Sequence, residues 1–191
     1  TPDASKTRYE NHEYYTKWTD LDPELKDEFL KFISALHNAE SMVQFFQSRR
    51  ELLSITLRLG HGHWVIPQSD FPVDDEDCFF QPNFLTGCKG SSDKYRWYPV
   101  WLGSTGEVST STGKPSQEIE EIHNRISKWQ KWLSRRGSRL LAESTHTWPK
   151  FPDIGVVPKE YRIFAGRTNS RKPDGQETIA RLQNIELNSY D

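Results

Sequence analysis

Residues 116–142 read SQEIEEIHNRISKWQKWLSRRGSRLLA, and the spacing of their apolar side chains decides the fold. Six apolar side chains recur at the spacing of one helical face. They are Ile119, Ile122, Ile126, Trp129, Leu133 and Leu140. We therefore predict one long amphipathic helix over 116–142, with Ser116 as its N-cap and its apolar stripe packed on the rest of the chain.

The opposite side of this helix is predicted to be basic, since no acidic residue occurs between Ile122 and Ala142. On a helical wheel its cations gather around Trp132. They are Arg125, Lys128, Lys131, Arg135, Arg136 and Arg139. Such a stripe indicates contact with the carboxylates or phosphates of a partner, to which Arg makes forked hydrogen bonds. The alternative is a solvated face whose cations only complement the helix dipole.

Two shorter helices are predicted nearer the N-terminus. Asp22-Pro23-Glu24 is a typical helix start, and apolar residues follow at helical spacing. A second helix is expected over 39–50, capped by Asn38 or Ser41. Residues 1–20 are polar with scattered aromatics, and we expect them to form an arm.

At Leu53 the apolar period changes to two, which predicts a strand over 53–59. Gly60-His61-Gly62 then predicts a turn and 63–66 a return strand, giving a first hairpin. A short strand over 78–80 and a loop over 87–93 are expected next.

Residues 94–102 predict a second, aromatic strand, which Pro99 places at a sheet edge or a bulge. Residues 108–112 are expected to return beside it as a second hairpin. Farther on we expect a short strand over 161–164, a mobile loop over 166–176 and a helix around 177–185.

The order of these elements predicts a single α+β domain spanning 1–191. Its antiparallel sheet would be built from two hairpins and packed by the long helix, with two further helices at the N-terminal side.

Aromatic residues make up 13% of the chain, with seven Trp, so the core is expected to be rich in them. We interpret Trp64, Trp97, Trp101 and Trp129 as core residues. In the alternative, Tyr95, Trp97 and Trp101 line an exposed strand edge that accepts a peptide by strand addition or stacks a nucleotide.

Charge is divided unevenly along the chain, although the formal net charge is only −2. Residues 1–92 hold nine Lys/Arg and fifteen Asp/Glu, whereas 93–191 hold sixteen and twelve. The imbalance indicates either a basic binding face or two halves that attract each other. Cys78 and Cys88 are the two cysteines, and their spacing leaves open whether they are bridged. This low cysteine content favours an intracellular protein, cytoplasmic or nuclear.

His61 and His63 lie at alternate positions and are candidates for a metal site, with Asp70, Asp74 or Cys78 completing it. Two histidines are too few ligands, so we expect solvated turn residues and no bound metal or cofactor. The acidic residues of 70–77 lack the ligand order of a calcium loop and predict a solvated loop.

The sequence contains none of the common catalytic motifs and no apolar run long enough to span a membrane. We therefore expect a non-enzymatic interaction module that binds a protein partner through the aromatic strand edge and the basic helix face. A nucleic-acid-binding module using that face is the alternative hypothesis. A metal-dependent hydrolase or nuclease using His61, His63 and the acidic loop is a third.

Overall fold

The computed structural model describes residues 14–16, 23–56, 63–71, 79–89, 95–137, 160–167 and 185–190. These residues build a six-stranded mixed sheet whose strands lie side by side in chain order. Its antiparallel part consists of β1 (Tyr15–Thr16), β2 (His63–Pro67), β3 (Phe84–Lys89) and β4 (Tyr95–Leu102). Its parallel part adds β5 (Tyr161–Phe164) and β6 (Ile185–Asn188) to β4. The α+β fold is confirmed, but the expected purely antiparallel sheet is wrong, because β5 and β6 run parallel to β4.

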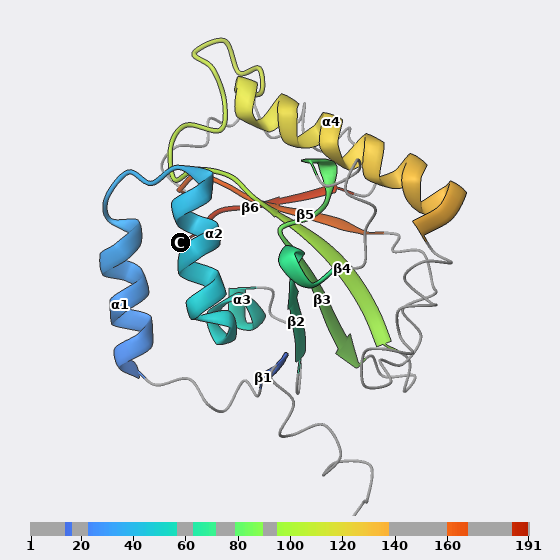
Figure 1. Ribbon diagram of the computed structural model, residues 1–191. Helices are drawn as coiled ribbons and strands as arrows, with labels where there is room; N and C mark the ends of the chain where they lie inside the picture. Colours follow the sequence, from blue (N-terminus) through green and yellow to red (C-terminus); the bar gives the residue numbers. More distant parts are fainter. Residues whose placement is uncertain are drawn as a thin grey trace, which may run out of the picture.

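Helices cover both faces of the sheet (Figure 1). One face carries α1 (Pro23–Ile33), α2 (Ala39–Ser48) and α3 (Arg50–Thr56). The other carries α4 (Gln117–Trp132), which continues as a π-helical turn (Leu133–Gly137). The two predicted N-terminal helices and the described part of the long helix are thus confirmed. Residues 138–142 lie outside the described part, and the expectation of a single domain stays a prediction.

Each strand supplies side chains to two separate cores, because neighbouring residues of a strand point to opposite faces. Trp64 and Ile66 of β2 join Trp129 of α4, whereas Val65 between them joins Phe46 of α2. All five side chains are buried. A sheet covered on both faces needs a continuous apolar run in its strands, which is what β2 has.

The starts of α2 and α4 are fixed by side-chain caps. The Ser116 hydroxyl accepts a hydrogen bond from the Ile119 amide at 3.4 Å, and the Asn38 side-chain oxygen accepts one from the Ser41 amide at 2.8 Å. Both helices therefore begin where the sequence predicts.

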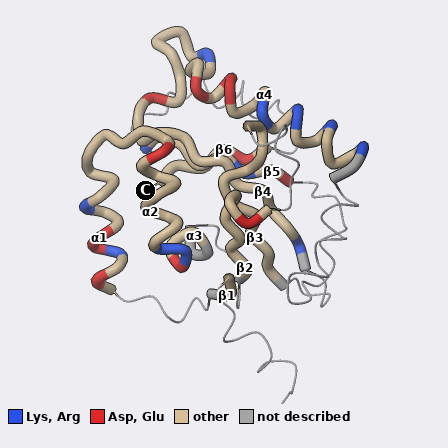
Figure 2. Tube along the Cα trace, viewed as in Figure 1, with Lys and Arg blue, Asp and Glu red and all other residues tan. Residues whose placement is uncertain are grey.

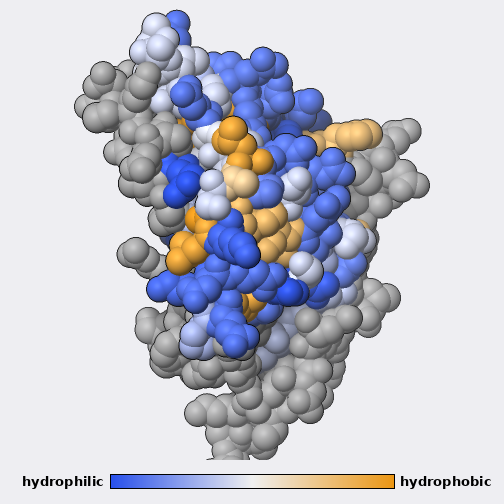
Figure 3. Space-filling view, turned by 90° about the vertical axis from the view of Figure 1, so that its left-hand side faces the viewer, coloured by the Kyte–Doolittle hydropathy of each residue, from blue (hydrophilic) through white to orange (hydrophobic). Residues whose placement is uncertain are grey.

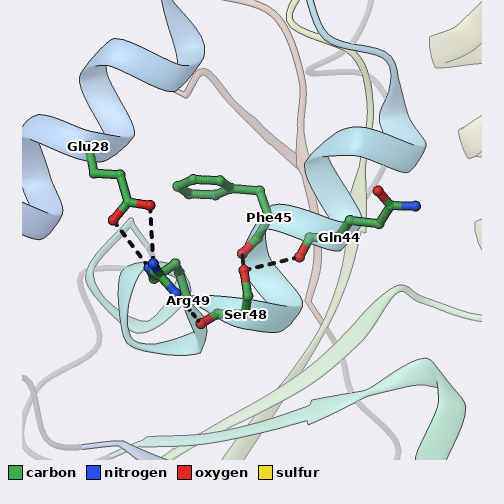
Figure 4. A network of polar contacts seen from close by, with 5 residues as sticks. All are labelled: Glu28, Gln44, Phe45, Ser48 and Arg49. Carbon is green, nitrogen blue, oxygen red and sulfur yellow. Dashed lines mark hydrogen bonds and ion pairs between the residues drawn. The ribbon is translucent and has the colours of Figure 1, made fainter.

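An ion pair between Glu28 and Arg49 links α1 to the end of α2 (Figure 4). Two Arg49 nitrogens donate to the two Glu28 carboxylate oxygens at 3.2 Å, and a third donates to the Ser48 carbonyl at 3.1 Å. Both charged side chains are exposed, so this pair contributes about 0–1 kcal/mol. The stacked rings of Phe32 and Phe45, 4.2 Å apart, hold the two helices together more strongly.

The predicted strand over 53–59 is wrong at 53–56, because α3 continues as helix through Thr56, while 57–59 lie outside the described residues. Leu52 and Leu53 are both buried in the core beneath α2, whereas consecutive residues of a strand would face opposite sides. A short apolar run does not by itself separate a strand from a buried helix. The first predicted hairpin is therefore wrong as well. Its return strand exists as β2, which pairs with β1 and β3 instead.

The loop expected over 87–93 begins instead with strand residues, since β3 extends through Gly87 to Lys89. Gly87 faces Trp97 of β4, and a side chain there would lie 2.6 Å from the indole ring. The glycine thus makes room for a cross-strand ring and marks no turn. The strand predicted over 78–80 is also wrong in its described residues, because Phe79 and Phe80 lie outside the six strands.

The second predicted hairpin is wrong because residues 108–112 do not pair with β4, whose neighbours among the described strands are β3 and β5. Residues 108–115 close on themselves through a bridge between Ser109 and Pro115 and a turn at Gly113, whose φ is 78°. β4 is therefore interior from Val100 to Leu102, whereas residues 95–99 pair with β3 alone among the described strands. Pro99 still fits, since β5 pairs with β4 only from Val100 onward.

Near the C-terminus, the short strand expected over 161–164 is confirmed as β5. The helix expected around 177–185 is wrong at Ile185, which begins β6, while 177–184 lie outside the described residues. Gly166, expected in a mobile loop, is held between the Ser104 carbonyl and the Tyr190 amide. Of the predicted arm over 1–20, the described residues 14–16 contribute β1 to the sheet.

Candidate functional site

Three cations form an exposed stripe on the C-terminal half of α4 and its π-helical turn: Lys128, Lys131 and Arg135. Acidic residues are confined to the first turns of the helix, where they complement the dipole (Figure 2). Among the described residues, none of the three cations is paired with a carboxylate. We call these three residues the basic stripe.

Trp132 does not belong to the exposed face, contrary to the prediction. It is buried, and its ring stacks on that of Trp129 with centroids 4.6 Å apart. Its place on the helical wheel borders the apolar stripe, so a side chain this large turns toward the core to bury its area.

Arg125 also departs from the predicted basic face. Its side chain is half-buried, and its Nη2 donates to the Gln81 carbonyl at 2.8 Å. Burial lowers the pKa of the Arg125 guanidinium. For Arg136 the described structure covers the backbone only, and Arg139 lies outside it.

The predicted aromatic strand edge is not exposed at Trp97 or Trp101, because both side chains are buried. The Trp101 indole donates to the Phe80 carbonyl at 3.3 Å, facing α4. The interpretation of Trp64, Trp97, Trp101 and Trp129 as core residues is confirmed. Of Tyr95, only the backbone in β4 is described.

The candidate metal ligands are not brought together in the described part of the chain, where no group of three or more His, Cys, Asp or Glu could hold an ion. Asp70 instead accepts hydrogen bonds from the hydroxyls of Tyr14 and Ser69. His61, Asp74 and Cys78 lie outside that part. Cys88 is a free thiol whose pKa is raised by burial.

The contact between α4 and the segment Phe79 to Gln81 was not predicted from the sequence. Phe80 lies beside Trp129, with ring centroids 6.4 Å apart, and Gln81 accepts the hydrogen bond from Arg125. Three buried donor nitrogens there have no acceptor among the described residues. They are Gln81 Nε2, Arg125 Nε and Trp129 Nε1. No sequence motif marks Gln81, whose role depends on a contact with a residue 44 positions away.

A different surface lies over α1, where apolar side chains emerge between hydrophilic ones (Figure 3). Leu30 and Leu36 are 45% and 85% exposed. The exposed cations of α1, Lys26 and Lys31, alternate along the helix with acids and form no unbroken basic stripe.

No family model matches the chain, and no curated protein is detectably similar to it. In the part of the chain that the structure describes, no helix has the length and apolarity needed to cross a bilayer.

Proposed function

We propose that this protein is a non-enzymatic interaction module that binds an acidic segment of another protein through the basic stripe. The observation that carries the proposal is the exposure of Lys128, Lys131 and Arg135 on one side of α4, without a paired carboxylate among the described residues. Unpaired charges of one sign on a rigid helix attract a partner of opposite sign and orient it. The expected intracellular setting is part of this proposal.

An acidic protein segment fits this surface better than a nucleic acid does. Sequence-independent binding of a single strand combines a cationic groove with a series of exposed aromatic rings. Trp132, the ring expected among the cations, is buried, and Phe79 alone does not form such a series. Glu118, Glu120 and Glu121 occupy the first half of the same helix and would repel a phosphate backbone that continues along it. A short acidic segment would contact only the C-terminal half of α4, where the basic stripe lies.

Fluorescence anisotropy tests the proposal with a short labelled polyglutamate peptide, labelled single-stranded RNA and labelled duplex DNA. Each probe is titrated at about 10 mM and about 150 mM salt. We expect the peptide to bind, and the triple variant Lys128→Gln/Lys131→Gln/Arg135→Gln to bind it about tenfold more weakly, since each exposed charge contributes a fraction of a kcal/mol.

The matched control is Lys26→Gln/Lys31→Gln, which removes exposed cations from α1 and is expected to bind as the unmodified protein does. Tight, salt-sensitive binding of RNA or DNA without binding of the peptide would replace the proposal by the nucleic-acid alternative. Equal binding by the triple variant and the unmodified protein would exclude the basic stripe.

A further inference from the structure

We infer that Arg125 receives one carboxylate of the acidic partner and contributes more to affinity than any single residue of the basic stripe. The inference rests on the proposed function and adds to it a binding residue and the chemical class of its ligand, an acidic side chain. Arg125 lies three residues before Lys128, between the stripe and the buried face of α4.

Within the described part of the chain, no negative charge compensates Arg125. Of the acceptors that the structure describes, only the Gln81 carbonyl is bonded to the guanidinium, and the buried Nε has none among them. No carboxylate of the described residues is paired with it. A cation partly removed from water without a counter-charge is energetically unfavourable. A partner carboxylate that binds the exposed part of the Arg125 side chain therefore contributes more binding free energy than one that binds a fully solvated lysine.

Two further buried donors favour an anion at this position. Gln81 and Trp129 are 2% and 1% exposed, and neither Gln81 Nε2 nor Trp129 Nε1 has an acceptor among the described residues. Trp129 follows Arg125 by one helical turn on the same side of α4, and Gln81 is bonded directly to Arg125. Both N–H groups are too enclosed to bond the carboxylate directly. Because neither has an acceptor among the described residues, their positive ends favour a negative charge nearby through surroundings of low dielectric constant.

The neighbouring residues define what should flank the carboxylate. Phe79 precedes Gln81 by two positions and is 88% exposed, while Lys128, the first residue of the basic stripe, follows Arg125 by three positions. An acidic residue next to an apolar one, followed by further acids, would place its carboxylate on Arg125 and its apolar neighbour near Phe79.

The test compares Arg125→Met, Lys128→Gln and Lys26→Gln/Lys31→Gln in anisotropy titrations with a short labelled peptide of glutamates around one leucine. We expect Arg125→Met to weaken binding at least about tenfold and Lys128→Gln less than about threefold. We also expect Arg125→Met to stay folded with a similar urea midpoint, because the lost hydrogen bond to the buried Gln81 carbonyl is offset by removal of a half-buried charge that no described carboxylate pairs.

The outcomes separate the inference from the proposed function. If Arg125→Met binds like the unmodified protein while the triple variant of the basic stripe does not, the inference is wrong and the proposed function stands. If the unmodified protein does not bind the peptide, both are wrong. Should Arg125→Met fail to fold, Arg125→Lys is tested in its place, because it keeps the positive charge but lacks the paired N–H donors of the guanidinium. Weaker binding with an unchanged unfolding midpoint then supports the inference, and unchanged binding overturns it.

Discussion

The hydroxyl of Tyr190 donates a buried hydrogen bond to the carbonyl of Gly103 at 2.7 Å, across 87 positions of sequence. Gly103 follows β4 and Tyr190 follows β6, so this bond ties together the carboxyl ends of two parallel strands that are not adjacent. The ring of Tyr190 also packs beside those of Phe46 and Phe164. One side chain thus joins the sheet to the layer of α2.

Tyr190→Phe should lower the free energy of unfolding by about 1–3 kcal/mol, because it leaves the buried Gly103 carbonyl without its donor while keeping the ring. Urea unfolding followed by tryptophan fluorescence measures the difference. Ser48→Ala is the control, since it removes an exposed hydroxyl bonded to the Phe45 carbonyl and should change stability by less than about 0.5 kcal/mol. Equal stability of Tyr190→Phe and the unmodified protein would contradict the role of this bond.

Alkaline pH should destabilise the protein through the same residue. Burial raises the pKa of Tyr190 well above its ordinary value, and so favours the neutral phenol in the folded state. Above about pH 10 the unfolded chain releases this proton and the folded one retains it, so stability present at lower pH is lost as pH rises. The loss per group approaches about 1.4 kcal/mol per pH unit.

Urea midpoints between about pH 8 and pH 11 test this dependence. We expect Tyr190→Phe to show a shallower decline than the unmodified protein. A residual decline should remain, because burial also raises the pKa values of Tyr98, Tyr161 and Cys88. Identical slopes for the two proteins would show that Tyr190 ionises equally in both states.

Gly87→Ala should destabilise the sheet by about 1–3 kcal/mol, because the added methyl group meets the Trp97 ring at 2.6 Å and forces it to move. Gly106→Ala is the control, since its nearest neighbour is the Ser104 hydroxyl at 3.3 Å. A double-mutant cycle with Trp97→Leu should give a smaller cost for the methyl group once the ring is gone. Additive effects would mean that the two residues do not compete for space.

The sequence predicted elements better than it predicted their partners. α4 and its Ser116 cap follow from local patterns, namely a helical apolar period and a polar residue before it. β4 was also predicted, but its neighbours were not, because β5 reaches it after more than fifty residues and no local signal encodes that pairing. Gly87 illustrates the same limit. A glycine is needed there because the Trp97 ring on the neighbouring strand occupies the space of a side chain, and no local pattern predicts that contact.

In the candidate site, too, local features were predicted and long-range contacts were not. The helical wheel placed Lys128, Lys131 and Arg135 on the exposed side, as the structure does. The wheel assigned Arg125 and Trp132 to that side as well, although both border the apolar stripe. At such borders the direction of the side chain depends on the neighbouring segment, and the contact of α4 with Gln81 was not predictable from local sequence.

A substitution at Trp132 tests directly whether this side chain lies on the exposed basic face of α4 or in the core. If it lay exposed among the cations, Trp132→Ala would change stability by no more than about 0.5 kcal/mol. Because it is buried against Trp129, we expect a loss of about 3–5 kcal/mol in urea unfolding. Lys131→Ala, one residue earlier and exposed, is the matched control and should unfold within about 0.5 kcal/mol of the unmodified protein. Lower unfolding free energy in both variants would indicate that α4 tolerates no side-chain truncation. Unchanged unfolding free energy in both would mean that Trp132 is exposed on the basic face.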